Sequence, residues 1–172
     1  MKVDADGFSF DFTDALDAFV FDEKDKSKPT YHGQPMKAVD VVVELAEGYI
    51  YIEIKDFHDP ERYDFKSVKT DGERKDRRVG FNYLKNYLKY KYRDSYLYRC
   101  AEHKVDKPVH YICLLSLDNA LAGFMGKVLK RELPVGQASK RWKQGIVESC
   151  QVVNFNKWNE AFPKWPVTRI AK

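Results

Sequence analysis

The sequence contains few cysteines and none of the short motifs that most directly identify an enzyme. Its three cysteines, Cys100, Cys113 and Cys150, are an odd number and include no C-x-x-C pair. This pattern argues against a disulfide framework or a zinc site and favours buried, reduced thiols. The chain also has no Walker loop, no G-x-S-x-G elbow and no zinc-ligand spacing, so these common nucleotide, hydrolase and metal signatures are excluded.

Long apolar runs are missing as well. No stretch approaches the roughly 20 apolar residues that a membrane helix needs. The first ten residues lack the basic start and apolar run of a signal peptide. We therefore expect a cytoplasmic protein with no membrane contact. There are no internal repeats, and 172 residues suffice for one domain with a hydrophobic core, so we expect a single domain over residues 1–172.

The overall charge is too small to identify a partner. Hydrophobic residues make up 44% and charged residues 33% of the chain, which is an ordinary globular balance. The net charge is +4, so the protein is only mildly basic. A nucleic-acid-binding function must therefore be argued from where the basic residues lie.

The spacing of apolar residues predicts helices before and after a β-hairpin. Phe12, Ala15, Leu16 and Phe19 recur at helical spacing, which predicts a helix over residues 12–23. In that helix Glu23 falls near the centre of the buried stripe and Asp22 near its edge. Strands are expected over residues 36–45 and 49–57, with residues 46–48 in the turn between them. No strand is expected before residue 36.

The second half of the chain predicts alternating helices and strands. A long helix is expected from about residue 77 to 102 and an interior strand over 109–117, which is apolar on both faces. Asp118 or Asn119 can cap a helix that runs through residue 129. A last strand over 146–155 and a short helix through 158–162 follow. Pro163 and Pro166 are expected to end the regular structure.

Side-chain alternation in the hairpin brings three charged residues together. Val41, Val43, Ile50 and Ile52 are the aliphatic positions of the two strands, and they must share one face to form a core. That register places Asp40 directly opposite Glu53, with their Cβ atoms roughly 5 Å apart. Lys55 lies one side-chain step further along the same face.

Two facing carboxylates repel each other, so a sheet built only for stability would avoid this pair. A divalent cation between Asp40 and Glu53 reverses the sign of that interaction. The nearby Lys55 ammonium can position water and stabilise negative charge that develops on phosphate. The alternative is a partly exposed hairpin in which Glu53 and Lys55 form a solvated charge pair.

The pattern of Asp40, twelve intervening residues and then Glu53-Ile54-Lys55 resembles the PD-(D/E)XK phosphodiesterase superfamily. The resemblance implies an α/β fold with a restriction-endonuclease-like core. This core is a mixed sheet with a helix before the hairpin, a long helix after it and helices on both faces. It would span about residues 10–117, with a family-specific addition over 118–172. Asp40 and Glu53 would then bind Mg²⁺, for which Mn²⁺ substitutes.

The resemblance also assigns the remaining site residues. The Ile54 carbonyl would be a further metal ligand, and Lys55 would serve the attacking water. Glu23 or Asp22 would take the acidic position on the preceding helix. Asp40, Glu53 and Lys55 are thus the expected catalytic residues.

Basic residues gather in the predicted long helix. Eight lie between Arg74 and Arg93, against one acid, Asp76. Such a surface attracts phosphate, and the interleaved tyrosines can stack on bases. The alternative is a solvated helix face in which Tyr83 and Tyr87 belong to the buried stripe. The expected nucleic-acid contacts are Arg74, Lys75, Arg77, Arg78, Lys85 and Lys89, with Lys140 and Arg141 in a later loop.

The leading hypothesis is a metal-dependent phosphodiesterase that cleaves nucleic acid, DNA rather than RNA, as an endonuclease. The alternative is a non-catalytic module on the same fold that binds nucleic acid or a protein. A homodimer, or a partner protein that supplies targeting, remains open in either case.

Overall fold

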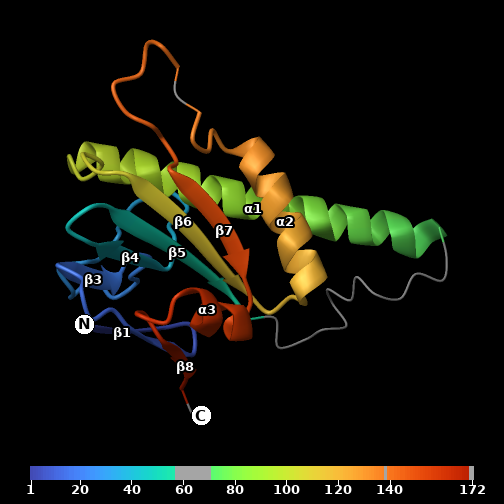
Figure 1. The fold of residues 1–172 in the computed structure, drawn as a ribbon, viewed down its shortest axis with the longest axis horizontal. Helices are drawn as coiled ribbons and strands as arrows, with labels where there is room; N and C mark the ends of the chain where they lie inside the picture. Colours follow the sequence, from blue (N-terminus) through green and yellow to red (C-terminus); the bar gives the residue numbers. More distant parts are fainter. Residues whose placement is uncertain (57–70, 138, 171–172) are drawn as a thin grey trace.

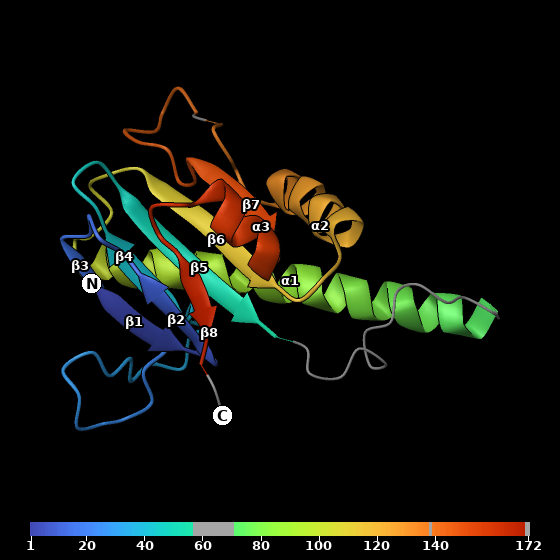
Figure 2. The same ribbon diagram turned by 60° about the horizontal axis from the view of Figure 1, so that its bottom comes forward.

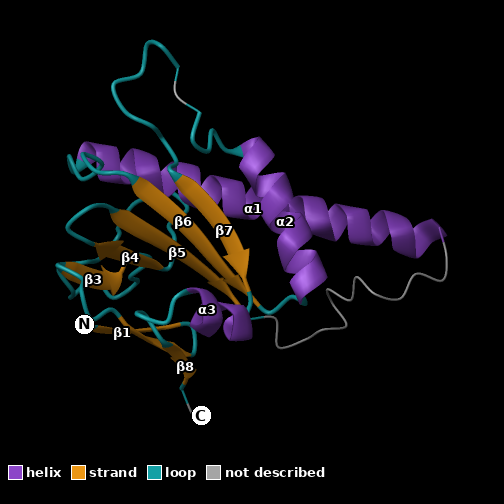
Figure 3. Ribbon diagram, viewed as in Figure 1, coloured by secondary structure: helices purple, strands orange, loops and turns teal. Residues whose placement is uncertain are grey.

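The computed structural model describes residues 1–56, 71–137 and 139–170, with the side chains of residues 71–79 outside the description. It has a mixed α/β fold with eight strands and three helices (Figures 1 and 3). The elements are β1 (Lys2–Ala5), β2 (Phe8–Asp11), β3 (Asp17–Val20), β4 (Val41–Glu44), β5 (Tyr49–Lys55), α1 (Asp71–Ala101), β6 (Val109–Leu115), α2 (Asn119–Glu132), β7 (Ser149–Val153), α3 (Phe155–Ala161) and β8 (Val167–Arg169).

The strands form two sheets. The larger sheet has the order β3-β4-β5-β6-β7, and the smaller has the order β1-β2-β8. In the larger sheet β4 is antiparallel to both of its neighbours, whereas β5, β6 and β7 run parallel. The crossover helices α1 and α2 make these parallel connections, as parallel strands require. The carboxyl ends of β5, β6 and β7 therefore meet at one edge of the sheet.

Each face of the five-stranded sheet has its own hydrophobic core. One core joins the sheet to α1 and α2 through residues such as Tyr51, Leu88 and Met125. The other joins the opposite face to the small sheet and α3, through residues such as Ile52 and Trp158. Figure 2 shows the small sheet and α3 on the side of the large sheet away from α1. Helices thus lie on both faces as predicted, but a second sheet shares one face with α3.

The predicted hairpin register is confirmed. Val41 pairs with Ile52 and Val43 with Ile50, and both pairs lie in the core against the small sheet. The turn is closed by the Leu45 N–H, which donates to the Gly48 carbonyl at 2.8 Å. Val39 breaks the expected alternation, because it lies in the core against α1 instead.

The helix predicted over residues 12–23 is wrong. These residues include β3, which pairs antiparallel with β4. Phe12 and Phe19 pack on opposite sides of the large sheet, and Leu16 is 58% exposed, so they share no helical stripe. Pairing with the edge of β4 outweighs helical spacing that local sequence alone suggests. The expectation of no strand before residue 36 is corrected with it, since β1, β2 and β3 all precede that position.

The second half of the chain follows the prediction more closely. The long helix, the strand after it, α2 and the short α3 are all present, and β6 is an interior strand. Asp118 caps α2, where its side chain accepts the Leu121 N–H. The structure adds β8 after Pro166, where no further element was expected. Cys113 and Cys150 are buried free thiols, as predicted. The helices in the described ranges are too short or too polar to cross a membrane.

Candidate carboxylate and lysine site

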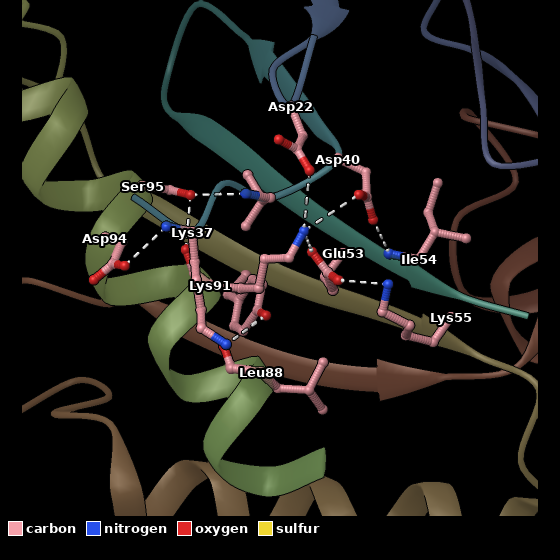
Figure 4. A network of polar contacts seen from close by, with 12 residues as sticks. Asp22, Lys37, Asp40, Glu53, Ile54, Lys55, Leu88, Lys91, Asp94 and Ser95 are labelled. Atoms are coloured by element: carbon pink, nitrogen blue, oxygen red, sulfur yellow. Dashed lines mark hydrogen bonds and ion pairs between the residues drawn. The ribbon is translucent and has the colours of Figure 1, made fainter. Parts of the chain in front are cut away.

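The hairpin brings Asp40 and Glu53 to the α1 side of the large sheet, as Figure 4 shows. Glu53 lies in β5, an interior strand, and its side chain is fully buried. Asp40 comes immediately before β4, and its side chain is 10% exposed. The Ile54 N–H donates to Asp40 Oδ2 at 2.6 Å, so the hairpin backbone itself orients this carboxylate.

Lys91 of α1 occupies the centre of the site. Its Nζ lies 3.3 Å from Glu53 Oε2 and 3.6 Å from Asp40 Oδ1. A third carboxylate, Asp22, reaches the same nitrogen at 3.5 Å from the segment that follows β3. The Lys91 side chain is only 6% exposed, so this is a largely buried ion-pair cluster. We call Asp22, Asp40, Glu53 and Lys91 the carboxylate cluster.

Lys55 flanks the cluster on the same face. Its Nζ lies 3.5 Å from Glu53 Oε1, and its side chain is 29% exposed. Neither oxygen of Glu53 has a hydrogen-bond partner within the described residues. The ammonium groups of Lys55 and Lys91 are therefore the nearest groups that offset its negative charge. A buried carboxylate in this condition is costly and is typical of a site that holds a ligand or carries out chemistry.

Burial and mutual repulsion perturb these groups. Desolvation and the neighbouring Asp40 raise the pKa of Glu53 to about 8. Burial also raises the pKa of Asp40, against the opposing effect of Lys91. Burial disfavours the charge on Lys91, but the carboxylates of Glu53 and Asp40 outweigh it and raise the pKa of the ammonium. Strong shifts of this kind cluster at functional sites.

A tyrosine ring links the cluster to the surface. Three ammonium groups surround the Tyr87 ring: Lys37 at 4.6 Å, Lys55 at 5.0 Å and Lys91 at 5.4 Å from its centroid. Tyr83 stacks on Tyr87 with centroids 6.3 Å apart and is 61% exposed. Tyr83 is therefore not part of the buried stripe to which its spacing assigned it, and Tyr87 is only partly buried. Tyr83 and Tyr87, with the ammonium groups of Lys37 and Lys55, form a basic and aromatic surface at the edge of the site.

The two predicted acidic positions before the hairpin separate in the structure. Asp22 joins the carboxylate cluster and also pairs with Lys24. Glu23 instead binds Lys28 at 2.6 Å and accepts the Asp25 N–H at 2.9 Å. Neither residue lies on a helix. Asp22 is thus the acid that the structure places beside Asp40 and Glu53.

Among the predicted nucleic-acid contacts with described side chains, none is an ion-pair partner of the carboxylate cluster. Lys85 and Lys89 lie on α1, where both bind Glu132 of α2 at 3.1 and 2.8 Å. Lys140 and Arg141 are exposed in the connection from α2 to β7, at the amino end of the parallel strands and so away from Lys55. The remaining four belong to the first turns of α1, and their side chains lie outside the described residues: Arg74, Lys75, Arg77 and Arg78.

The position of Lys91 on the long helix is itself a sequence signal. Leu84 and Leu88 face the core, and Lys91 and Ser95 continue their stripe at helical spacing. A lysine on the buried side of a helix needs a charged partner, so its position alone predicts a carboxylate nearby. Lys37 carried no comparable signal, because its place depends on how α1 docks.

The donor set suits a hard divalent cation, although the centre of the cluster is taken by an ammonium. Carboxylate oxygens are the ligands that Mg²⁺ prefers, and both oxygens of Glu53 are free of hydrogen bonds from described residues. No group of three or more Asp, Glu, His or Cys side chains in the described part of the chain is arranged to hold a metal ion as it stands. The three carboxylates are instead spread around the Lys91 nitrogen.

Comparisons of the chain with protein-family models, curated proteins and solved structures found no match.

Proposed function

We propose that the protein is a Mg²⁺-dependent phosphodiesterase that acts on nucleic acid, with DNA favoured over RNA. The observation that carries this proposal is the buried pair of Asp40 and Glu53 on adjacent strands, with Lys55 on the same face. Of the order that the PD-(D/E)XK resemblance implies, the hairpin, the long helix and the following strand are present, whereas β3 stands where a helix was expected before the hairpin.

The residues of the site have separable roles in this proposal. Asp40 and Glu53 would hold Mg²⁺, with Asp22 and the Ile54 carbonyl as further oxygen ligands. The metal ion supplies charge stabilisation at the phosphate and lowers the pKa of bound water. Lys55 is exposed enough to reach the attacking water or a phosphate oxygen while it stays beside Glu53.

The surface around Tyr87 supports a phosphate-bearing substrate. Lys37 and Lys55 bring positive charge to the edge of the site, where a nucleic-acid backbone would be attracted. The exposed Tyr83 ring offers a face on which a base can stack. We infer that the substrate strand approaches along this part of α1.

A cleavage assay tests the proposal. Supercoiled DNA, single-stranded DNA and RNA are incubated with the protein in Mg²⁺ or Mn²⁺, with EDTA as the metal-free control. We expect metal-dependent cleavage of at least one substrate, and a loss of about a hundredfold or more in Asp40→Asn and Glu53→Gln. The matched control is Glu47→Gln, which changes an exposed glutamate in the hairpin turn. Equal cleavage by all three variants, or no cleavage by any protein, would refute the proposal.

The second candidate is a nucleic-acid-binding module without catalysis. It is favoured by one observation: Lys91 already compensates part of the carboxylate charge, so the fold does not depend on a metal ion. Under this alternative the wild type binds nucleic acid in EDTA but cleaves no substrate. Glu53→Gln and Lys55→Ala then leave biological activity intact.

A further inference from the structure

The position of Lys91 conflicts with a metal ion at the same place. Its nitrogen lies 3.3 to 3.6 Å from oxygens of three carboxylates, near the point on which they converge. Mg²⁺ binds oxygen ligands at about 2.1 Å and needs the same oxygens. An ammonium and a divalent cation cannot both occupy the centre of this cluster.

We propose that the Lys91 ammonium is the resident cation of the carboxylate cluster, and that a divalent metal ion binds there only by displacing it. This inference rests on the proposed function and adds to it a residue that sets the metal affinity. Lys91 is thus a competitor for the metal position and not a metal ligand.

A divalent cation would attract these carboxylates more strongly than Lys91 does. The carboxylates of Asp22, Asp40 and Glu53 face three ammonium groups: those of Lys91 and Lys55, and that of Lys24, which pairs with Asp22 from the surface. A divalent cation in place of Lys91 puts two positive charges where there was one. The gain is greatest where the dielectric is low, as it is around the fully buried Glu53.

The hairpin backbone positions Asp40 and Glu53 independently of Lys91. Asp40 is anchored by the Ile54 N–H at 2.6 Å, and Glu53 belongs to a strand that is paired on both sides. The cluster can therefore survive the exchange of one cation for another.

Lys91 also has a second place to go. Its Nζ lies 5.4 Å from the centroid of the Tyr87 ring, which Lys37 and Lys55 also approach. We expect the flexible four-methylene stem to carry the displaced ammonium along this partly buried ring toward the surface.

Metal titration of a Lys91→Met variant tests the proposal. Methionine keeps the length and apolar character of the stem but removes the charge. With Mn²⁺ as the probe, isothermal titration calorimetry should show binding roughly tenfold or more tighter in Lys91→Met than in wild type, because the competing charge is gone. The matched control, Lys107→Met, removes a half-buried lysine that pairs with Glu44 and should leave Mn²⁺ affinity unchanged.

A measurement on the wild-type protein covers the case in which Lys91→Met does not fold. Lysines are acetylated briefly in EDTA and in saturating Mn²⁺, and each site is quantified by mass spectrometry. Lys91 should be protected in EDTA and become several-fold more reactive with Mn²⁺, since it leaves its 6% exposed position. Lys89, held by Glu132, is the internal control and should not change.

The outcomes separate this inference from the proposed function. If the wild type binds Mn²⁺ while Lys91 stays protected, or if Lys91→Met binds Mn²⁺ no tighter, displacement is wrong and the metal-dependent enzyme stands. If neither protein binds Mn²⁺, both the displacement and the metal-dependent function are refuted. Support requires metal-induced exposure of Lys91 in the wild type, together with tighter binding in Lys91→Met where that variant folds, with the matching controls unchanged.

Discussion

Glu53 is the residue on which the chemistry of the site depends. It is fully buried in an interior strand, yet it is a carboxylate with two ammonium groups as its only close charge partners among the described residues. A buried ion-pair cluster of this kind contributes little net stability, because the desolvation of the charges offsets their mutual attraction. That the chain carries a carboxylate here favours a role in binding or catalysis over one in stability.

This burial predicts an unusual dependence of stability on pH. The pKa of Glu53 is raised from 4.5 to about 8, so between these values the folded state holds a proton that the unfolded chain has released. Stability of the metal-free protein should therefore fall as the pH rises from about 5 to about 8, and then level off. Urea unfolding in EDTA measures this slope.

Glu53→Gln identifies the group responsible. The glutamine cannot ionise, so the fall in stability between about pH 5 and pH 8 should become much smaller. Glu47→Gln, in the exposed turn, should retain the wild-type slope. An unchanged slope in Glu53→Gln would mean that another group titrates.

Ser95 holds α1 and the segment before Asp40 together. Its hydroxyl accepts the buried Val39 N–H at 2.8 Å and donates to the Lys91 carbonyl at 2.7 Å, so it ties the segment before Asp40 to α1. Ser95→Ala leaves a buried N–H without a partner and should cost about 1–3 kcal/mol in unfolding free energy. Asp94→Ala is the control, because Asp94 accepts the Lys37 N–H in an exposed position and should cost less. Equal losses in urea unfolding would contradict this assignment.

At the scale of elements, Glu132 joins α1 to α2 and masks two of the basic residues of α1. Lys85 and Lys89 both bind its carboxylate. Glu132→Gln should release their charge and raise affinity for a DNA duplex about fivefold at low salt, with a steeper salt dependence. Fluorescence anisotropy in EDTA measures both quantities. If affinity does not rise, this face of α1 does not contact nucleic acid.

The hairpin could be predicted because its information is local. Strict alternation fixed which side chains share a face, and a short connection fixed the register, so Asp40 and Glu53 had to meet. The N-terminal segment had no such constraint. Its phenylalanines fit a helix by spacing, and only the edge of β4 decides that residues 17–20 form a strand.

The contact between Lys91 and Glu53 could not be predicted from local sequence patterns. Lys91 is 38 residues from Glu53 in the chain and meets it only because α1 docks across the sheet at one particular angle. Spacing predicted that α1 exists and indicated which side is buried, but the translation of a helix along a sheet depends on many packed side chains. The particular carboxylates that Lys91 meets could therefore not be derived from the sequence, although its place on the buried side of α1 indicates that it has a carboxylate partner. The meeting of Asp40 with Glu53 could be derived.

At the scale of the whole molecule, the large sheet is held between two separate cores. Trp158 of α3 is fully buried in the core beneath the small sheet, and its Nε1 donates to the Trp165 carbonyl at 2.7 Å. Trp158→Ala should cost about 3–5 kcal/mol in unfolding free energy, because it leaves a large cavity. Trp142→Ala, which removes a tryptophan that is 39% exposed, is the matched control and should cost far less. Similar urea midpoints for the two variants would show that the second core is not needed.

The strand pairing of the small sheet also determines how late in synthesis this sheet can be completed. Residues 8–10 pair with residues 167–169, so the partner of β2 is synthesised 157 to 161 residues later. At ribosomal rates of roughly 5–20 residues per second, this delay is on the order of ten seconds. Phe8 and Phe10, which are buried in the finished protein, lack that covering strand throughout this interval. We therefore expect the aromatic segment of β2 to be a binding site for chaperones until β8 has been synthesised.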